Sequence, residues 1–207
     1  MIEGLRAHDH ETLRAMATFG SFDVVIDITS GDGGEYLTYV TSLPEARPVS
    51  KSAKHAVFEI PQRAVPADLG PTRPIIGVRA NAGPDQWIID GDVLTSWTDG
   101  PQRPGQFVLA DLGQAGDVAG VTMAFGESAG DFPRHLIIDT STDGLDWMPA
   151  WEGNAAGASY RSAVLQPLQS RAQFQFAPRP ARFVRLRQTA KHQNLWRIHD
   201  LQIHGPR

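Results

Sequence analysis

The sequence predicts a mainly β fold, a β-sandwich or jelly roll preceded by a small α/β segment. Three observations lead to this prediction. From Ile75 onward, short apolar runs recur between turns. The 20 glycines and 15 prolines are aperiodic and lie between such runs, which is typical of turns in an all-β domain. Several prolines also interrupt the chain before Ile75. We therefore expect a small α/β segment at 1–61, a proline-rich linker at 62–74 and the sandwich at 75–207.

The first segment alternates helical and strand patterns. Apolar residues at helical spacing predict a helix that Gly20 ends, and the β-branched run at 22–28 is typical of a buried parallel strand. A segment this short buries little surface alone. The predicted elements are a helix at 10–19, a strand at 22–28, a turn at 30–34, a helix at 35–43 and a strand at 56–60.

The glycine-rich turn at 30–34 invites comparison with a phosphate-binding loop, because it lies between a strand and a helix. It lacks the Lys-Ser/Thr ending and the full glycine spacing of such loops. We therefore predict a plain connecting turn.

The second segment reads as short strands separated by turns. In the run at 183–187 the apolar residues Val184 and Leu186 alternate with arginines, as on a half-buried strand. Asp143-Gly144 is a turn signal between two strands. The predicted strands lie near 75–80, 107–112, 119–125, 135–141, 147–152, 163–168, 173–176, 182–188 and 196–204.

Composition limits the classes of function. The formal net charge of −4, with 20% charged residues of mixed sign, argues against a nucleic-acid-binding protein. The absence of cysteine excludes disulfides and thiolate-bound zinc. No apolar run approaches the roughly 18 residues of a membrane span. No paired carboxylates, nucleophile with base, or cofactor loop emerges, so we expect a binding module that is not an enzyme.

Five motifs occur in a characteristic order along the second segment. They are Asp90-Gly91 with Thr95 and Trp97, QFVLADLG at 106–113, STDGLDW at 141–147, ARFVRL at 181–186 and WRIHDLQIHG at 196–205. With these motifs, residues 75–206 resemble the discoidin family, also called the coagulation-factor type C domain, which includes many bacterial carbohydrate-binding modules. The resemblance implies a discoidin-like jelly roll whose termini lie close together, with binding at loops on one end and no catalysis.

An acidic loop is a candidate metal site. Asp90, Asp92 and Thr95 lie within six residues, and calcium takes six to eight oxygen ligands. The resemblance implies a structural calcium held by this loop together with a Glu on the last strand, where this chain has Asp200. We therefore predict a calcium site at these four residues. The alternative is that Asp90 caps a turn and Asp200 pairs with an arginine.

The candidate ligand site lies on loops that share one end of the sandwich if strands alternate in direction. Sugar recognition needs an aromatic face for C–H groups and planar polar side chains for hydroxyls. The loops are 81–87, 98–105 and 126–133, and the predicted ligand residues are Trp87, Gln102, Arg103 and Phe132. The third loop carries acids where galactose-binding relatives often carry Arg and Asn. The alternative is that Trp87 packs under its loop and ligand binding has been lost.

Two further sets of side chains have structural interpretations. Trp97, Trp147 and Trp196 lie beside predicted strands, where aromatic residues usually pack in the core. The arginines at 179, 182, 185 and 187 form a basic stripe. We expect this stripe to be a solvated strand face paired with acids, the alternative being contact with anionic lipid or glycan.

The function predicted from these patterns is non-catalytic binding of carbohydrate or glycoconjugate. Residues 1–74 loosely resemble the soluble tail of bacterial polytopic membrane glycosyltransferases. That resemblance implies a parent membrane enzyme as partner, with this chain as its C-terminal, extracytoplasmic, periplasm-facing part. The alternatives are a structural or protein-docking sandwich without a small-molecule ligand, and peripheral membrane binding, which loop tips rich in Gly, Asp and Gln disfavour.

Overall fold

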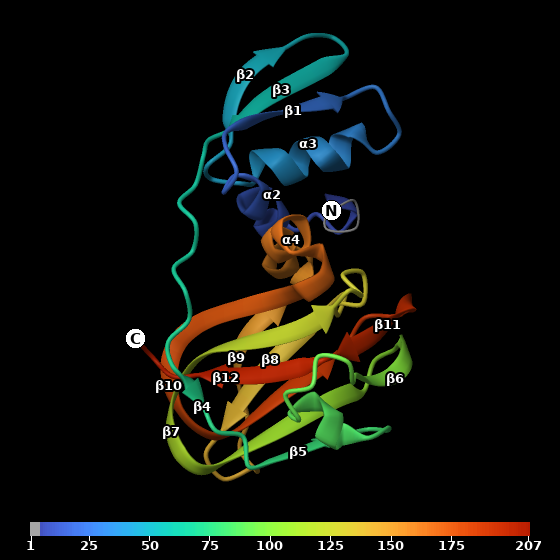
Figure 1. The fold of residues 1–207 in the computed structure, drawn as a ribbon. Coiled ribbons are helices and arrows are strands. Elements are labelled where there is room, and N and C mark those ends of the chain that lie inside the picture. The colour runs from blue at the N-terminus through green and yellow to red at the C-terminus, as the bar shows by residue number, and fades with distance from the viewer. Residues whose placement is uncertain (1–4) are drawn as a thin grey trace. The chain divides into compact units, whose positions relative to one another are not determined.

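A computed structural model of the protein describes residues 5–207. The chain forms two compact units, Met1–Pro66 and Ala67–Arg207, called unit 1 and unit 2 below. Figure 1 shows the path of the chain through both. Among the residues described, no helix is both long and apolar enough to cross a membrane.

Unit 1 is a small antiparallel sheet with helices on one face (Figure 1). The strand order is β1-β3-β2, and β3 is antiparallel to both neighbours. Leu13, Tyr39 and Phe58 are among the buried side chains of its core. The elements are α2 (His10–Met16), β1 (Phe22–Asp27), α3 (Gly33–Thr41), β2 (Arg47–Lys51) and β3 (His55–Ile60).

The helices and the two predicted strands of unit 1 are confirmed, but the parallel pairing expected for 22–28 is wrong. The reason is β2, which the sequence analysis missed. Helix α3 returns the chain to β2, and a hairpin then inserts β3 antiparallel between β2 and β1. Every residue of β2 is exposed, so its sequence carries no alternating hydrophobic pattern that could have revealed it.

Unit 2 is the predicted β-sandwich. Its main sheet has the order β4-β12-β7-β10-β8-β9, β5 also pairs with β7, and β6 pairs with β11 in a second sheet. All of these pairings are antiparallel. The elements are β4 (Thr72–Arg73), β5 (Gly77–Ala80), η1 (Asp85–Ile88), β6 (Trp97–Gln102), β7 (Gln106–Gly126), β8 (Leu136–Ser141), β9 (Met148–Gly153), α4 (Ala155–Leu165), η2 (Pro167–Gln169), β10 (Ser170–Gln188), β11 (His192–Ile198) and β12 (Asp200–His204).

Long bent strands replace several predicted short ones. Strands 107–112 and 119–125 are parts of β7, and strands 173–176 and 182–188 are parts of β10. The register between β7 and β10 shifts at Gln175/Arg179 and Ala181/Phe183. Such irregularities bend a strand without ending it, and Figure 1 shows β7 and β10 curling around one edge of the sheet. The predicted strand 196–204 is instead two strands, β11 and β12.

The strand predicted at 163–168 is wrong, because these residues form the end of α4 and then η2. Asn154 caps the helix by accepting a hydrogen bond from Ala156 N at 2.7 Å. The β-branched and leucine content of Ala163–Leu165 favoured a strand, yet Val164 and Leu165 are 51% and 55% exposed. The small residues at 155–157 are buried, and their packing favours the helix.

Two tryptophans form the centre of the core of unit 2. Trp97 and Trp196 are fully buried and meet edge to face, with ring centroids 5.3 Å apart and an interplanar angle of 89°. Such a pair contributes about 0.5–1.5 kcal/mol beyond the area it buries. Their assignment to the core is confirmed. The assignment of Trp147 is wrong, because this half-buried ring lies under the guanidinium of Arg185, 4.0 Å from its Cζ.

Candidate functional site

A buried amide joins three segments at the loop end of the sandwich. Gln102 Nε2 donates to Phe132 O at 2.9 Å and to Leu195 O at 3.0 Å. Its Oε1 accepts from Arg134 N at 2.8 Å and from Gln188 Nε2 at 3.0 Å. Gln102 is 1% exposed, so the structure does not display this predicted ligand residue. It holds loop 126–133 against β6 and β11.

Phe132 is also inside the fold. Its ring is 6% exposed, and the guanidinium of Arg134 lies 4.0 Å above it. Two of the four predicted ligand residues are therefore core residues in this structure. The sequence analysis placed Gln102 on a loop at 98–105, but residues 97–102 form β6, whose pairing with β11 turns that amide inward.

Trp87 and Arg103 remain on the surface. Trp87 is 40% exposed on η1, so its indole presents an aromatic face to solvent. Arg103 lies in the turn between β6 and β7, with a side chain 55% exposed. Its guanidinium donates to the Asp99 carboxylate at 3.0 Å and to Asp99 O at 2.8 Å. The ion pair orients this cation while leaving much of it accessible.

Hydrogen bonds that the sequence analysis missed connect these loops. Arg197 of β11 donates to the Asp131 carboxylate at 2.9 Å and to Ser96 Oγ at 3.2 Å. Asn194 Nδ2 donates to Gly130 O at 3.2 Å. The only sequence signal was the position of these polar residues beside buried Trp196 on a predicted strand. We define the rim as η1 and its preceding loop (81–88), the turn 103–105 and the loop 127–134.

Asn81 holds the first rim loop to the second. Its Nδ2 donates to Gly105 O at 3.3 Å, and its Oδ1 accepts from Phe107 N. Nearby, Trp97 Nε1 donates to Ala82 O. The first two rim segments are therefore fixed to each other, and the third is fixed to β6 and β11, which gives a surface that is organised before a ligand arrives.

The acidic loop is organised by its own side chains. The Asp90 carboxylate accepts from Asp92 N and from Thr95 Oγ1, each at 2.9 Å. Asp92 Oδ1 accepts from Leu94 N at 2.9 Å. Asp90 thus caps the turn, as one alternative proposed. Among the residues that the structure describes, Asp200 pairs with no arginine, and its carboxylate accepts from Gln202 Nε2 at 2.9 Å.

Asp90 and Asp200 lie near each other, because the loop meets the start of β12. Burial raises the pKa of the Asp200 carboxyl, and the negative charge of Asp90 raises it further. His199 also bridges to the loop, with Nδ1 3.0 Å from Val93 O. A desolvated carboxylate beside a like charge suits a cation. The described residues contain no cluster of three His, Cys, Asp or Glu for a metal, so a cation here would also need hydroxyl or backbone oxygens.

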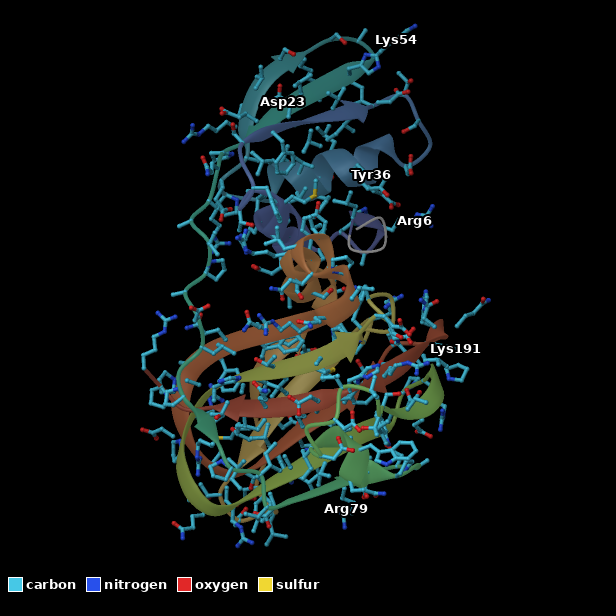
Figure 2. The ribbon with its side chains drawn as sticks, viewed as in Figure 1. Arg6, Asp23, Tyr36, Lys54, Arg79 and Lys191 are labelled. Carbon is cyan, nitrogen blue, oxygen red and sulfur yellow. The ribbon has the colours of Figure 1, made fainter. Side chains whose placement is uncertain are left out.

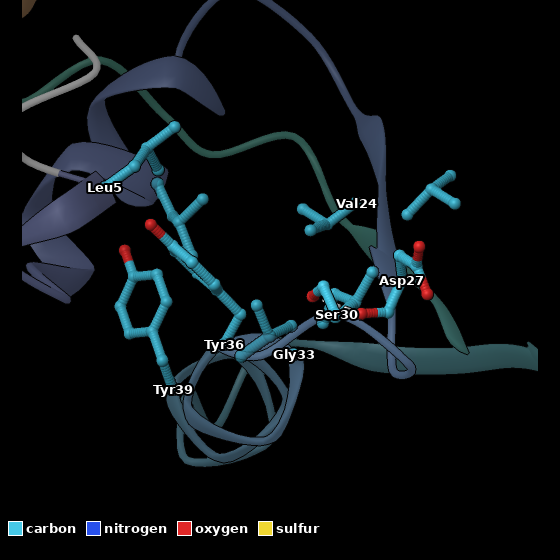
Figure 3. A pocket seen from close by; sticks show the side chains of 11 residues that line it. Leu5, Val24, Asp27, Ser30, Gly33, Tyr36 and Tyr39 are labelled. Carbon is cyan, nitrogen blue, oxygen red and sulfur yellow. Dashed lines mark hydrogen bonds between the residues drawn. The ribbon is translucent and has the colours of Figure 1, made fainter. Parts of the chain in front are cut away.

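Unit 1 contains a separate cavity of about 180 Å³. Figure 3 shows Tyr36 and Tyr39 extending from α3 and Val24 of β1 across from them. The lining is mainly apolar, with Asp27 and Ser30 at one side. The Tyr39 hydroxyl donates to Asp9 O at 2.7 Å, and burial raises the pKa of this phenol above its usual range. Exposed Val25 and Ser30 are part of the lining, so the cavity opens to solvent at the edge of a small core.

The turn at 30–34 is the predicted connecting turn. Ser30 Oγ donates to Asp27 O at 2.8 Å and to Asp32 Oδ1 at 3.0 Å. Asp32 is the N-cap residue of α3, and its negative charge opposes an anion at this helix end. A Cβ on Gly33 would lie 2.3 Å from Asp27 O, so the glycine serves close backbone packing.

Comparison with known proteins identifies the fold of unit 2. The sequence family described as F5/8 type C domain matches residues 76–201. No curated protein matches the chain. A truncated AlyQ with CBM32 and alginate lyase domains aligns with a TM-score of 0.52 and 21% identity, covering 66% of this chain and 34% of that one. This chain therefore spans about a third of that structure's length.

Two single-module structures align over nearly their whole length. The CBM32 of AlyQ in complex with 4,5-unsaturated mannuronic acid has a TM-score of 0.51 and 23% identity, covering 64% of this chain and 96% of that one. CpGH89CBM32-5 from Clostridium perfringens, in complex with GalNAc-beta-1,3-galactose, has a TM-score of 0.50 and 18% identity, covering 62% and 94%. These likenesses confirm the predicted β-sandwich.

Proposed function

This chain belongs to the F5/8 type C domain family, and from that membership we propose that unit 2 is a non-catalytic module that binds carbohydrate at its rim. The observation that carries the proposal is the exposed indole of Trp87 next to loops held by the buried amide of Gln102. An accessible aromatic face packs against the C–H groups of a sugar, and a preorganised rim reduces the entropic cost of binding. Structures of this fold bound to sugars add support.

The revised ligand set is Trp87 and Arg103, with Gln102 and Phe132 as positioning residues. Trp87 supplies the apolar face, and Arg103 supplies donors that Asp99 holds in place. Gln102 and Phe132 act by fixing loop 127–134. Binding through one indole and one guanidinium on an open rim is shallow, so we expect dissociation constants near 1 mM, the weak end of the affinity scale.

A glycan array with the whole chain tests the proposal. We expect signals for a subset of neutral glycans, reduced at least tenfold by Trp87→Ala. Leu168→Ala is the matched control, because Leu168 is 74% exposed and lies on η2, outside the rim. A blank array for the unmodified protein, or equal losses from both variants, would contradict carbohydrate binding at the rim.

We also propose a structural calcium at the acidic loop. The carboxylates of Asp90 and Asp200 and the hydroxyl of Thr95 are the hard oxygen donors that calcium prefers. Asp92 would offer calcium its backbone oxygen, because its carboxylate already accepts a hydrogen bond from Leu94 N. Calcium would neutralise the two neighbouring acids and stabilise the loop. Calorimetric titration with calcium after chelator treatment tests this, and absence of binding at millimolar calcium would refute it.

The parent protein is a separate proposal. The pattern of residues 1–74 supports attachment to a larger membrane enzyme of the glycosyltransferase kind, with this chain on the extracytoplasmic side. No curated protein or aligned structure bears on this link. The genomic reading frame upstream of Met1 tests it, because a series of hydrophobic spans there is expected. An upstream frame without such spans would remove the proposal and leave rim binding unaffected.

Protein docking is a second candidate function. Val93 and Leu94, at the tip of the acidic loop, are 71% and 88% exposed. A contact with another protein would remove these two side chains from water. A crosslink from this loop to a partner, together with a blank glycan array, would favour docking over sugar binding.

A further inference from the structure

A groove lies on the outward face of the main sheet of unit 2, and Gly105 is the one rim residue that lines it. Its volume is about 280 Å³. It runs over β5, β7 and β10, and the turn between β8 and β9 forms one wall. Val108, Ala110, Val184 and Leu186 point into the core, so the residues between them face outward. Arg79, Phe107, Leu109, Trp147, Arg185 and Arg187 are the lining residues that matter here.

The register places these side chains in two rows across the strands. Arg79 pairs with Leu109, and Leu109 pairs with Arg185. In the next row, Phe107 pairs with Arg187. Each row therefore alternates a cation with an apolar side chain. Directly opposite residues of a sheet lie about 4.5–5.5 Å apart, so each row is continuous.

Positive charge is in excess in the groove. Arg185 and Arg187 both donate to the single carboxylate of Asp139, at 3.0 and 2.5 Å. Asp139 lies beneath them with a side chain only 3% exposed, so one carboxylate faces two cations. Glu152 contributes a weaker attraction to Arg187 from the far side. Arg79, in contrast, makes no ion pair or side-chain hydrogen bond with any residue that the structure describes. Figure 2 labels it on β5.

The floor and wall of the groove are apolar and partly aromatic. Phe107 and Leu109 are half-buried between the arginine rows. Trp147 forms the wall and stacks under Arg185, whose Cζ lies 4.0 Å from the ring. This stacking and the pair with Asp139 hold Arg185 in one orientation without using all of its donors. A guanidinium that is charged, held in one orientation and still has unused N–H donors can bind an oxyanion.

We propose that this groove is a second binding site, specific for a carboxylate-bearing sugar such as a uronic-acid oligosaccharide. Arg79 and Arg185 bind the carboxylates through charge-assisted hydrogen bonds. Phe107, Leu109 and Trp147 contact the C–H faces of the pyranose rings. The alternation of cation and apolar side chain matches a chain of rings that each carry a carboxylate. Because the overall charge is −4, a groove with three arginines and one carboxylate is a selective feature.

This site goes beyond the proposed rim function and uses different side chains. It meets the rim at Gly105, which lines the groove, and through Gln188, which also lines it and donates to Gln102. A neutral sugar would form only ordinary hydrogen bonds with the arginines, whereas a carboxylate forms charge-assisted ones. An acidic peptide would lack pyranose faces to pack on the apolar floor. The groove and the rim are therefore separable by the charge of the ligand and by mutation.

The test is isothermal titration calorimetry of the whole chain with trigalacturonate. The fully methyl-esterified trimer is the uncharged counterpart, and triglutamate is the peptide counterpart. We expect millimolar binding of trigalacturonate, at least fivefold weaker binding of the other two, and weakening by added salt. Arg79→Gln should weaken trigalacturonate binding at least fivefold without changing the unfolding temperature, because Arg79 makes no contact that supports the fold.

Two variants control the test. Arg171→Gln removes an exposed arginine at the start of β10, outside the groove, and should leave binding unchanged. Trp87→Ala removes the rim indole and should also leave trigalacturonate binding unchanged while it lowers neutral-glycan signals. The proposal is overturned if trigalacturonate does not bind, if its methyl ester or triglutamate binds equally well, if Arg171→Gln matches Arg79→Gln, or if Trp87→Ala abolishes binding.

Discussion

Unit 1 and unit 2 each enclose a hydrophobic core, but unit 2 has about twice as many residues with which to do so. Unit 2 closes a core around Trp97 and Trp196 and has enough interior to bury the amide of Gln102 with four hydrogen-bond partners. Unit 1 has one small sheet, a strand β2 that is exposed throughout, and a cavity of about 180 Å³ at the edge of its core. A larger core can bury polar groups together with their hydrogen-bond partners, and these groups position surface loops.

The difference explains where the two proposed binding sites lie. In unit 2, buried polar side chains at the ends of strands fix the rim, and a buried carboxylate, Asp139, fixes the arginines of the groove. In unit 1, the polar contacts include local caps such as Asp9 with Thr12 and long-range pairs such as Arg14 with Glu45 and the Tyr39 hydroxyl with Asp9 O. The long-range pairs join α2 to α3 and to the loop that follows α3.

Trp196→Ala should have the largest effect on this comparison. Removing a fully buried indole costs about 3–5 kcal/mol of folding free energy. Because the two units have separate cores, we expect two unfolding transitions by scanning calorimetry, with only that of unit 2 moving to lower temperature. A single transition that shifts as a whole would show that the units unfold together.

Gln102→Leu should destabilise unit 2 by about 2 kcal/mol, because it removes the partner of Leu195 O and of Arg134 N and leaves Phe132 O with only its bond from Arg134 Nη1. It should also reduce glycan-array signals by loosening loop 127–134. Gln114→Leu is the control, since Gln114 is exposed and makes no side-chain hydrogen bond with the described residues. Chemical denaturation measures both variants, and a loss equal to that of the control would refute the role assigned to Gln102.

Val24→Ile should act on unit 1 alone. The added methylene enters the cavity between β1 and α3 and should stabilise this unit by about 0.5–1 kcal/mol. The unfolding transition of unit 1 should rise while that of unit 2 stays constant. Destabilisation would mean that the cavity cannot accept the group without strain.

Asp200→Asn should have the smallest effect on the unfolding temperature. The direction of that change shows whether the carboxylate destabilises the fold when no calcium is bound. Burial raises the pKa of this carboxyl in the folded state, so the stability it contributes is present at low pH and is lost as pH rises through the folded-state pKa. Without calcium at pH 7, the variant should therefore unfold at a slightly higher temperature than the unmodified protein, and the difference should vanish near pH 4.

Added calcium should reverse that order. Calcium should raise the unfolding temperature of the unmodified protein more than that of Asp200→Asn, because the variant lacks one carboxylate ligand. A variant less stable than the unmodified protein in chelator at pH 7 would show that the carboxylate supports the fold without a metal.

Several features could be predicted from the sequence because they depend on local patterns. The alternation at 183–187 predicted a half-exposed strand. The pair Arg182–Asp111 and the carboxylate of Asp139, which Arg185 and Arg187 share, confirm that the basic stripe pairs with acids. Asp143-Gly144 predicted the turn between β8 and β9, where Gly144 has a positive φ of 79°. The five ordered motifs predicted the family. Each of these signals lies within a few consecutive residues.

Only the tertiary structure decided which side chains are available to a ligand. Polar Gln102 and aromatic Trp87 both lie near strand ends. Yet Gln102 is 1% exposed, whereas Trp87 is 40% exposed. The sequence did not reveal the groove either, because its rows of side chains join β5, β7 and β10, which are distant in sequence. Sequence periodicity specifies which face of a strand a residue occupies, whereas exposure depends on which strand pairs beside it. That pairing is set by the packing of the whole core, and no local pattern contains it.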